Sequence, residues 1–199
     1  ESLSDLTGPW ILLVDDHPVA AKDQLVRTYH PFEKYPDNPV LPGDAPWEYD
    51  LVYAYGTSLP DESGQGYRLW YHGLPTAHED QVYRLLYATS EDGVTWNKPF
   101  LGIVNWFGST DNNIFINRTD RDHIPSIIHT PWDPDPNKRY RMVNWDSTYG
   151  AYLGAYSADG IHWTDSPANP LFQSGGDVGQ FVWDPHTQRY LGYPKTFAP

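Results

Sequence analysis

The chain has 199 residues, 39% of them hydrophobic and 16% aromatic, so it can fill a substantial core and is not expected to be disordered. Its net charge of −13 argues against a nucleic-acid partner, because proteins that wrap a phosphate backbone present a basic face. No stretch approaches the roughly 18 apolar residues of a membrane span, so we expect no membrane partner.

The composition favours strands over helices. Tyrosine, tryptophan, proline and glycine are abundant, and no window of ten or more residues has a period of 3.6. The chain has no cysteine, which excludes disulfides and thiolate sites. The sequence therefore predicts an all-β protein.

The amino-terminal segment, residues 1–45, contains one strong predicted strand, Trp10–Val14. The pattern Ser-x-Asp-Gly-x-x-Trp then occurs twice, at 90–96 and 157–163, each time after a tyrosine-rich run. Asp-Gly between two strand-like runs predicts a tight hairpin turn. We expect 87–89 to pair with 94–96, and the second copy to pair in the same way.

The similarity extends upstream of each hairpin. Residues 51–71 parallel 123–145, and 178–195 form a third, incomplete copy, so each unit reads as four antiparallel strands. A four-stranded unit repeated radially is a β-propeller blade. The alternative is a twisted open stack or sandwich of hairpins.

The fold prediction is a single β-propeller domain over 1–199, with four-stranded antiparallel blades at 46–100 and 101–168 and part of a third at 169–199. These make about two and a half blades, whereas a closed propeller needs at least about four. We therefore expect the remainder of the propeller to come from a longer chain or a partner chain.

Four motifs carry a family resemblance: HPFEKYPDNPVL, SEDGVTW, STDNNIFI and SADGIHW. They resemble the five-bladed propeller glycoside hydrolases of families 32, 43 and 117, and particularly the uncharacterised family 32-like relatives. Sialidases have one more residue between Asp and Gly, and no arginine triad suits a sialic acid here. The resemblance implies a secreted or periplasmic enzyme, its leader already removed, that degrades a poly- or oligosaccharide.

Three aspartates are candidate catalytic residues. Asp50 lies eleven residues before Asp61, as Asp122 lies eleven before Asp133, so the two occupy equivalent positions in consecutive blades. Asp177 precedes the inner strand of the third copy. Glycosidic cleavage uses one carboxylic acid and one carboxylate, and strands arranged around one axis bring such residues together.

The resemblance implies a role for each acid. Asp50 would be the nucleophile or base, and Asp122 would orient a partner and tune its pKa. The related enzymes place the proton donor, a Glu, on a later blade, but no Glu follows Glu91. Either Asp177 substitutes or the acid lies beyond Pro199.

Other polar and aromatic residues in entry-side loops are candidates for substrate binding. They are Trp47, Glu48, Trp106, Asp111, Asn112 and His123. For Asp111 and Asn112 the alternative is an Asx-rich loop, and for Trp47 and Trp106 it is packing in the core. No histidine pair has a helical ligand spacing, so we expect no metal ligand set and no cofactor, with a structural Ca2+ the one ion that the resemblance allows.

The remaining acidic and tryptophan positions are expected to be structural. Asp61, Asp133 and Asp184 fall in turns, Asp92 and Asp159 in the hairpins, and Trp70, Trp96, Trp145 and Trp163 within strands. The predicted function is a glycoside hydrolase that uses carboxylate acid/base catalysis. A non-catalytic carbohydrate-binding propeller and an interaction scaffold are the alternatives.

Overall fold

The computed structural model describes residues 16, 19, 21–48, 51–74, 82–118 and 122–196. The chain divides into two units, Glu1–Pro36 and Asp37–Pro199. The described residues of the first unit form neither helix nor strand, and in them Asp16 pairs with Lys22 at 3.0 Å and with Arg27. The predicted strand at Trp10–Val14 lies outside the described residues. No helix of the described residues is long and apolar enough to cross a membrane.

The first sheet of the second unit, blade 1, has four antiparallel strands in the order β1-β2-β3-β4. The outer edge of β3 is shared by two short strands, because β5 as well as β4 pairs with β3. The strands are β1 Val52–Pro60, β2 Tyr67–Gly73, β3 Arg84–Ser90, β4 Trp96–Asn97 and β5 Ile114–Ile116.

The second sheet, blade 2, repeats this arrangement: β6, β7 and β8 are consecutive, and β9 and β10 share the outer edge of β8. Its elements are β6 Asp122–His129, the 3-10 turn η1 Pro136–Lys138, β7 Tyr140–Asp146, β8 Ala151–Ser157, β9 Thr164–Asp165 and β10 Phe172–Gln173. Blade 3 consists of two strands, β11 Gly179–Asp184 and β12 Arg189–Pro194.

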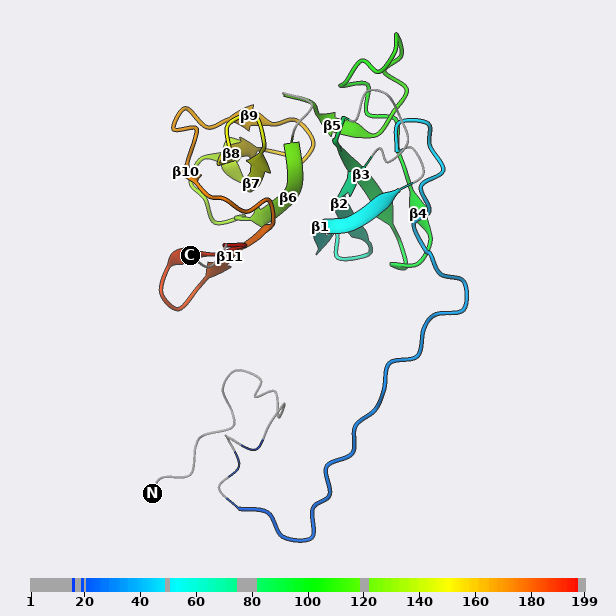
Figure 1. Cartoon of the computed structure of the whole chain (residues 1–199), viewed down its shortest axis with the longest axis vertical. Helices are drawn as coiled ribbons and strands as arrows, with labels where there is room; N and C mark the ends of the chain where they lie inside the picture. Colours follow the sequence, from blue (N-terminus) through cyan, green and yellow to red (C-terminus); the bar gives the residue numbers. More distant parts are fainter. Residues whose placement is uncertain are drawn as a thin grey trace. The chain divides into compact units, whose positions relative to one another are not determined.

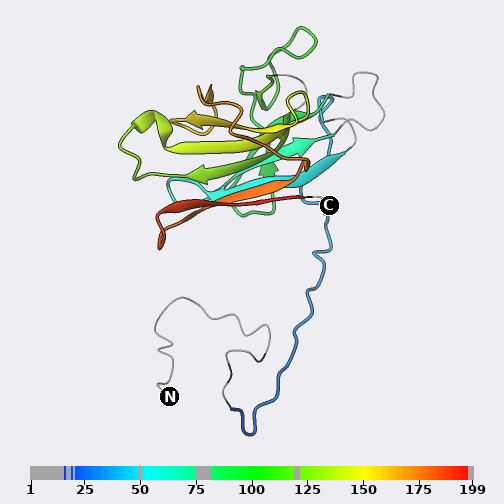
Figure 2. The same cartoon turned by 60° about the vertical axis from the view of Figure 1, so that its left-hand side comes forward.

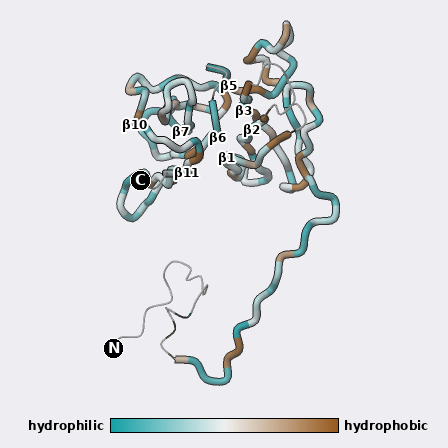
Figure 3. Tube along the Cα trace, viewed as in Figure 1, coloured by the Kyte–Doolittle hydropathy of each residue, from teal (hydrophilic) through white to brown (hydrophobic). Residues whose placement is uncertain are grey.

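The predicted all-β class and the four-stranded antiparallel units are therefore confirmed, with the third copy represented by its first two strands. Among the first strands of the three sheets, β6 contacts both β1 and β11, and the three lie toward the middle of Figure 1, with β4 and β9 outward. The view in Figure 2 is consistent with blades packed side by side. Figure 3 shows that hydrophobic residues follow the strands, notably β3 and β5.

The repeated hairpin is wider than predicted. The sequence predicted pairing of 87–89 with 94–96, but the ladder instead joins Ser90 to Trp96 across a five-residue loop, and blade 2 has the same register. The physical reason is that the aspartate side chain closes the loop, so a two-residue backbone turn is unnecessary.

Asp92 and Asp159 hold these loops in the same way, which confirms their structural role. Asp92 accepts the backbone N–H groups of Val94 and Thr95 at 2.8 and 2.7 Å. Asp159 accepts the two equivalent N–H groups, both at 2.8 Å. The backbone bonds from Thr95 and Val94 lower the pKa of Asp92 to about 2.

The turn aspartates Asp61, Asp133 and Asp184 likewise accept backbone N–H groups within their own turns, as predicted. Of the four tryptophans expected in the core, Trp70 is fully buried, and Trp96, Trp145 and Trp163 are partly buried against the hydrophobic clusters.

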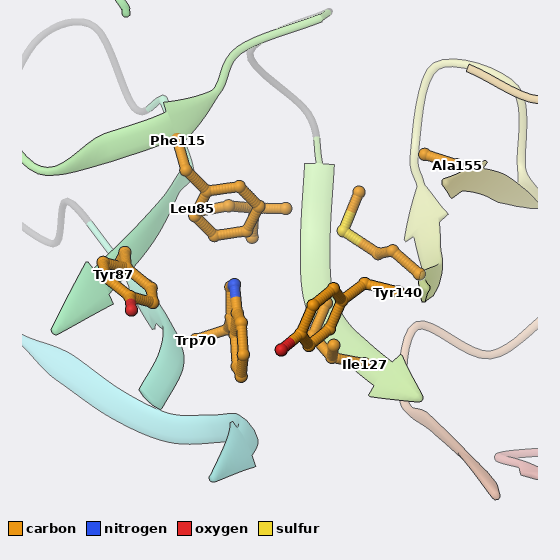
Figure 4. Packing of buried hydrophobic residues seen from close by; sticks show 8 residues of the cluster. Trp70, Leu85, Tyr87, Phe115, Ile127, Tyr140 and Ala155 are labelled. Carbon is orange, nitrogen blue, oxygen red and sulfur yellow. The ribbon is translucent and has the colours of Figure 1, made fainter. Parts of the chain in front are cut away.

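The interface between blades 1 and 2 is the largest part of the core. Figure 4 shows Trp70, Leu85 and Phe115 of blade 1 directed toward Tyr140 and the neighbouring residues of blade 2. Ala155, from the third strand of blade 2, completes the cluster. Burial of this many large side chains makes the two blades one hydrophobic unit.

The blade 2 hairpin also bonds to blade 1. Arg68 donates to the hydroxyls of Tyr87 and Tyr140, both at 2.8 Å, and to the carbonyl of Asp159. The Trp70 indole donates to the carbonyl of Gly160 at 2.7 Å. The Ser-x-Asp-Gly-x-x-Trp loop is therefore a docking element as well as a turn.

Candidate functional site

The three inner strands are linked in the same way at each blade boundary. The N–H of Ile127 in β6 donates to the Thr57 hydroxyl of β1 at 2.9 Å, and the N–H of Phe181 in β11 donates to the Ser126 hydroxyl of β6 at 2.8 Å. These links hold β1, β6 and β11 side by side. Residues at the beginnings of these strands consequently fall at one end of the inner layer.

β-bulges follow the beginnings of β1 and β6. The pairing register shifts between Tyr53 and Thr57 in β1, and between His123 and Ser126 in β6. A Cβ at Gly56 would lie 1.8 Å from the Trp70 carbonyl oxygen, so the first bulge requires glycine. In the second, Ile124 has φ +46°, a region that disfavours β-branched residues. Bulges re-aim side chains and often lie beside functional sites.

Asp122, at the first position of β6, is 2% exposed and accepts three donors. Its Oδ1 receives Asn144 Nδ2 at 2.8 Å and the Arg118 guanidinium at 3.0 Å, and its Oδ2 receives the Arg118 backbone N–H at 3.2 Å. Burial raises the pKa of Asp122, an effect that Arg118 and Asn144 oppose. The carboxyl group is rigidly held within blade 2.

Asp177, just before β11, has the opposite environment. Its side chain is half-exposed and pairs with Lys195 at 2.7 Å, which lowers the pKa of Asp177, and His123 also lowers it. The ion pair favours the ionised carboxylate. This is the reverse of what a proton donor at neutral pH needs.

Asp50, the third acidic candidate, lies outside the described residues. The described part of β1 begins two residues later, at Val52. Its role stays a prediction.

His123 lies in a cluster of rings between blades 1 and 2. Its ring centroid is 4.0 Å from that of Tyr83, 5.2 Å from Trp145 and 5.6 Å from His72. His72 is buried, and neither ring nitrogen has a hydrogen-bond partner in the part of the chain that the structure describes. Burial lowers the pKa of His72 to about 3, so the ring is neutral. Sequence reasoning missed His72 and Tyr83, since nothing in their local pattern distinguishes them from core residues.

Trp47 and Glu48 belong to a different region, on the face of blade 1 that carries Tyr71 and Ile114. Glu48 is fully buried and accepts Lys98 Nζ at 2.6 Å, the Ala45 N–H at 3.0 Å and the Tyr71 hydroxyl. This carboxylate has internal partners for both oxygens and closes the loop that precedes β1.

The other binding candidates lie near Trp47. Trp106 contacts it with a ring separation of 5.9 Å, and Asn112 is buried, with its amide bonded to the Val104 carbonyl at 2.8 Å and to the Ile114 N–H at 3.0 Å. Asp111 is exposed in the same loop. The contacts of Trp47, Glu48, Trp106 and Asn112 thus lie with one another and with blade 1, whereas Asp122 bonds to Arg118 and Asn144.

A pocket of about 400 Å3, lined by both polar and apolar residues, adjoins Asp122 through Arg118. Arg118 donates to Asp165 at 2.7 Å while also pairing with Asp122, so it joins the buried acid to the pocket wall. Tyr149, 56% exposed, and Asn169 line the same pocket. An exposed ring beside charged and amide groups suits recognition of sugar hydroxyls.

Metal binding finds no support in the described residues, where no group of three or more His, Asp or Glu side chains is placed to hold an ion. The structural Ca2+ suggested by the resemblance stays untested.

No protein-family model and no curated protein matches the chain. Among solved structures, a fructofuranosidase from Schwanniomyces occidentalis complexed with fructose is similar at 18% identity and a TM-score of 0.51, over 69% of this chain and 28% of that chain. A variant of that enzyme complexed with fructosylnystose is similar at 17% identity and a TM-score of 0.50, with the same coverages of 69% and 28%.

A protein from Bacteroides ovatus, provisionally assigned as a glycoside hydrolase, is similar at 16% identity and a TM-score of 0.46, over 77% of this chain and 48% of that chain. The chain spans less than a third of the length of the fructofuranosidase chains. At these identities the likeness concerns the fold, and at that level the resemblance to propeller glycoside hydrolases is confirmed.

Proposed function

We propose that the chain is part of a glycoside hydrolase that cleaves a poly- or oligosaccharide with carboxylates at the beginnings of its inner strands. The observation that carries the proposal is the contrast between two acids at the same end of the inner layer. Asp122, the first residue of β6, is buried with a raised pKa, and Asp177, just before β11, is ion-paired with a lowered pKa. Carboxyl groups whose environments push their pKa values apart are typical of glycosidase active sites.

The contacts support distinct roles. Asp122 has donors on both oxygens, which suits a residue that positions and tunes its neighbours rather than one that attacks the sugar. Asp177 is half-exposed, and its ion pair with Lys195 favours the ionised carboxylate, which argues against the predicted alternative of Asp177 as the proton donor. Asp50 keeps the predicted role of nucleophile or base.

A non-catalytic carbohydrate-binding propeller is the second candidate. It is favoured by the pocket that Arg118, Tyr149 and Asp165 line, which has sugar-binding chemistry without an evident proton donor. In this case the chain would bind an oligosaccharide and leave it intact.

The test is a screen for reducing-sugar release, paired with calorimetric binding, on a panel of poly- and oligosaccharides. Fructose-containing oligosaccharides come first, because two of the similar structures hold fructose or fructosylnystose. We expect Asp50→Asn to lose at least about 100-fold in kcat while retaining sugar affinity. Asp184→Asn, in a turn distant from these acids in its blade, is the matched control.

Binding without turnover on every sugar would reject the hydrolase proposal and leave the carbohydrate-binding propeller as the remaining candidate function. Neither binding nor turnover would reject both candidates. Hydrolysis that Asp50→Asn leaves at the wild-type rate would remove Asp50 from the mechanism.

A further inference from the structure

The pocket of about 400 Å3 that adjoins Asp122 through Arg118 has the size of a small-molecule site. Its walls come from blade 2 and from the end of the segment that leads into it, and neither Asp122 nor Asp177 lines it. Asp122 is 2% exposed and reaches the pocket only through its pair with Arg118. A molecule bound in the pocket therefore has no access to the oxygens of Asp122.

One wall of the pocket is held in place by hydrogen bonds to β8. Asn169 exchanges two bonds with Gly154: its Oδ1 accepts the Gly154 N–H at 2.7 Å, and its Nδ2 donates to the Gly154 carbonyl at 2.9 Å. The Ser166 N–H donates to the same carbonyl at 2.9 Å. Because segment 166–170 is already fixed to the sheet, little ordering is required when a ligand enters.

The charges around the pocket cancel one another. Its lining includes one basic and one acidic side chain, Arg118 and Asp165, which bond to each other at 2.7 Å. Arg118 also pairs with Asp122 at 3.0 Å, so its positive charge is shared by two carboxylates. A ligand carboxylate would have to compete with both, whereas a hydroxyl can donate to Asp165 and leave the pair intact. The pocket therefore favours an uncharged ligand that carries hydroxyl groups.

Tyr149 gives the pocket an aromatic surface. Its side chain lies in the turn between β7 and β8 and is 56% exposed, and Leu153 and Pro170 add aliphatic contacts. Asp165, with a side chain that is 54% exposed, supplies an accessible hydrogen-bond acceptor. A sugar ring has C–H groups on its face and hydroxyls at its edge, so it matches this combination of ring and carboxylate.

We propose that this pocket binds one uncharged sugar unit at a distance from the acids that would cleave the saccharide. Tyr149 packs against the face of the sugar ring, and Asp165 accepts its hydroxyls. The assignment of this site rests on the proposed carbohydrate function, and it adds a class of sugar and a second site where a sugar binds without being cleaved. Binding at the pocket and cleavage are then separable properties of the protein.

Isothermal titration calorimetry with D-glucose, D-galactose, D-xylose and D-fructose tests the site, with D-glucuronate as the charged comparison. At least one neutral sugar should bind saturably, and glucuronate should bind about tenfold more weakly than the best of them. Tyr149→Ala and Asp165→Asn should each weaken binding about tenfold. The matched controls are Tyr193→Ala, at a side chain 66% exposed outside the pocket lining, and Asp184→Asn in the turn after β11. Both controls should bind as the wild type does.

Saturation-transfer NMR on the same samples registers binding that is too weak for calorimetry. No binding by any neutral sugar, a preference for glucuronate, or wild-type binding by both pocket variants overturns the proposal. Circular dichroism of the variants checks that they are folded.

Hydrolysis assays separate this site from the proposed function. Hydrolysis without binding at the pocket would overturn the second site and leave the hydrolase standing. Binding at the pocket without hydrolysis would support the site and reject the hydrolase. On a polysaccharide that the chain cleaves, Tyr149→Ala should raise KM and leave kcat unchanged, because the pocket contributes binding and no chemistry.

Discussion

The boundary between blades 1 and 2 and the boundary between blades 2 and 3 are built from equivalent strands. Within the residues that the structure describes, a third strand and its hairpin loop cover the first boundary and not the second. At the first boundary, β8 and its hairpin cover Trp70 and Phe115, and Arg68 bonds to the hairpin carbonyl. At the second, the corresponding space is a groove. Arg141, the counterpart of Arg68 because it lies opposite Tyr156 as Arg68 lies opposite Thr89, has an unpartnered Nε in the described structure. The third strand and loop of a blade therefore contact and stabilise the preceding blade as well as their own sheet.

The largest effect should come from removing the centre of the filled boundary. Trp70→Ala deletes a fully buried indole from the cluster and should lower the free energy of unfolding by about 3–5 kcal/mol. Urea unfolding followed by circular dichroism measures it. Trp132→Ala, at a side chain that is 55% exposed, should change stability by less than about 1 kcal/mol. Equal losses would contradict the importance assigned to the filled boundary.

Two equivalent glycines distinguish the role of the repeated loop as a turn from its role in packing against the preceding blade. Gly93 and Gly160 occupy the same position of the repeat with φ +76° and +78°, so alanine strains both backbones similarly. A Cβ at Gly160 would also lie 2.8 Å from the Trp70 ring, whereas at Gly93 the nearest atom, in Tyr67, is 3.5 Å away. Gly160→Ala should therefore cost about 1–3 kcal/mol more than Gly93→Ala. Thermal unfolding of both variants provides the comparison, and matching losses would argue that the loop does not dock tightly.

The two arginines should differ for the same reason. Arg68→Gln leaves buried hydroxyls and a carbonyl without their charged donor and should cost about 2 kcal/mol. Arg141→Gln, at the open groove, should cost less than about 1 kcal/mol, because its ion pair with Asp133 is partly exposed. Denaturant midpoints of the two variants test this, and the reverse order would break the equivalence between them.

The smallest expected effect is on the stability of the protein at acidic pH. Because the pKa of Asp92 falls from 3.8 to about 2 on folding, its stabilising contribution is fully present above pH 3.8 and is lost as pH falls through about 2. Asp92→Asn should therefore flatten the loss of stability in that window. Unfolding midpoints from pH 5 to pH 2 would measure it, and superimposable profiles would show that the carboxylate bonds do not stabilise the loop.

Local patterns predicted well wherever a residue acts on its own neighbours. Asp92 and Asp159 were expected in turns, and they bond within their loops. The register of the same loops was missed, because the side-chain bonds that widen them cannot be counted from a hairpin rule. The repeat also indicated which strands are equivalent, and therefore that Asp122 begins an inner strand.

Candidate-site residues were harder to place, because their roles depend on distant segments. Glu48 was expected at a sugar site, and the structure buries it against Lys98, 50 residues away. Asp177 was considered as a proton donor, and its pairing with Lys195 at 2.7 Å favours the opposite charge state. His72 gave no signal, since its contact with His123 exists only when two blades pack.

By itself, the sequence determined the strands, the turns and their repetition, because alternation of side chains and the backbone freedom of Asp-Gly are properties of a few consecutive residues. Only the tertiary structure decided which acids are buried, which are ion-paired and which residues pack across the boundary between blades. Those outcomes depend on desolvation and on partners contributed by other blades, and neither is written in the neighbouring sequence.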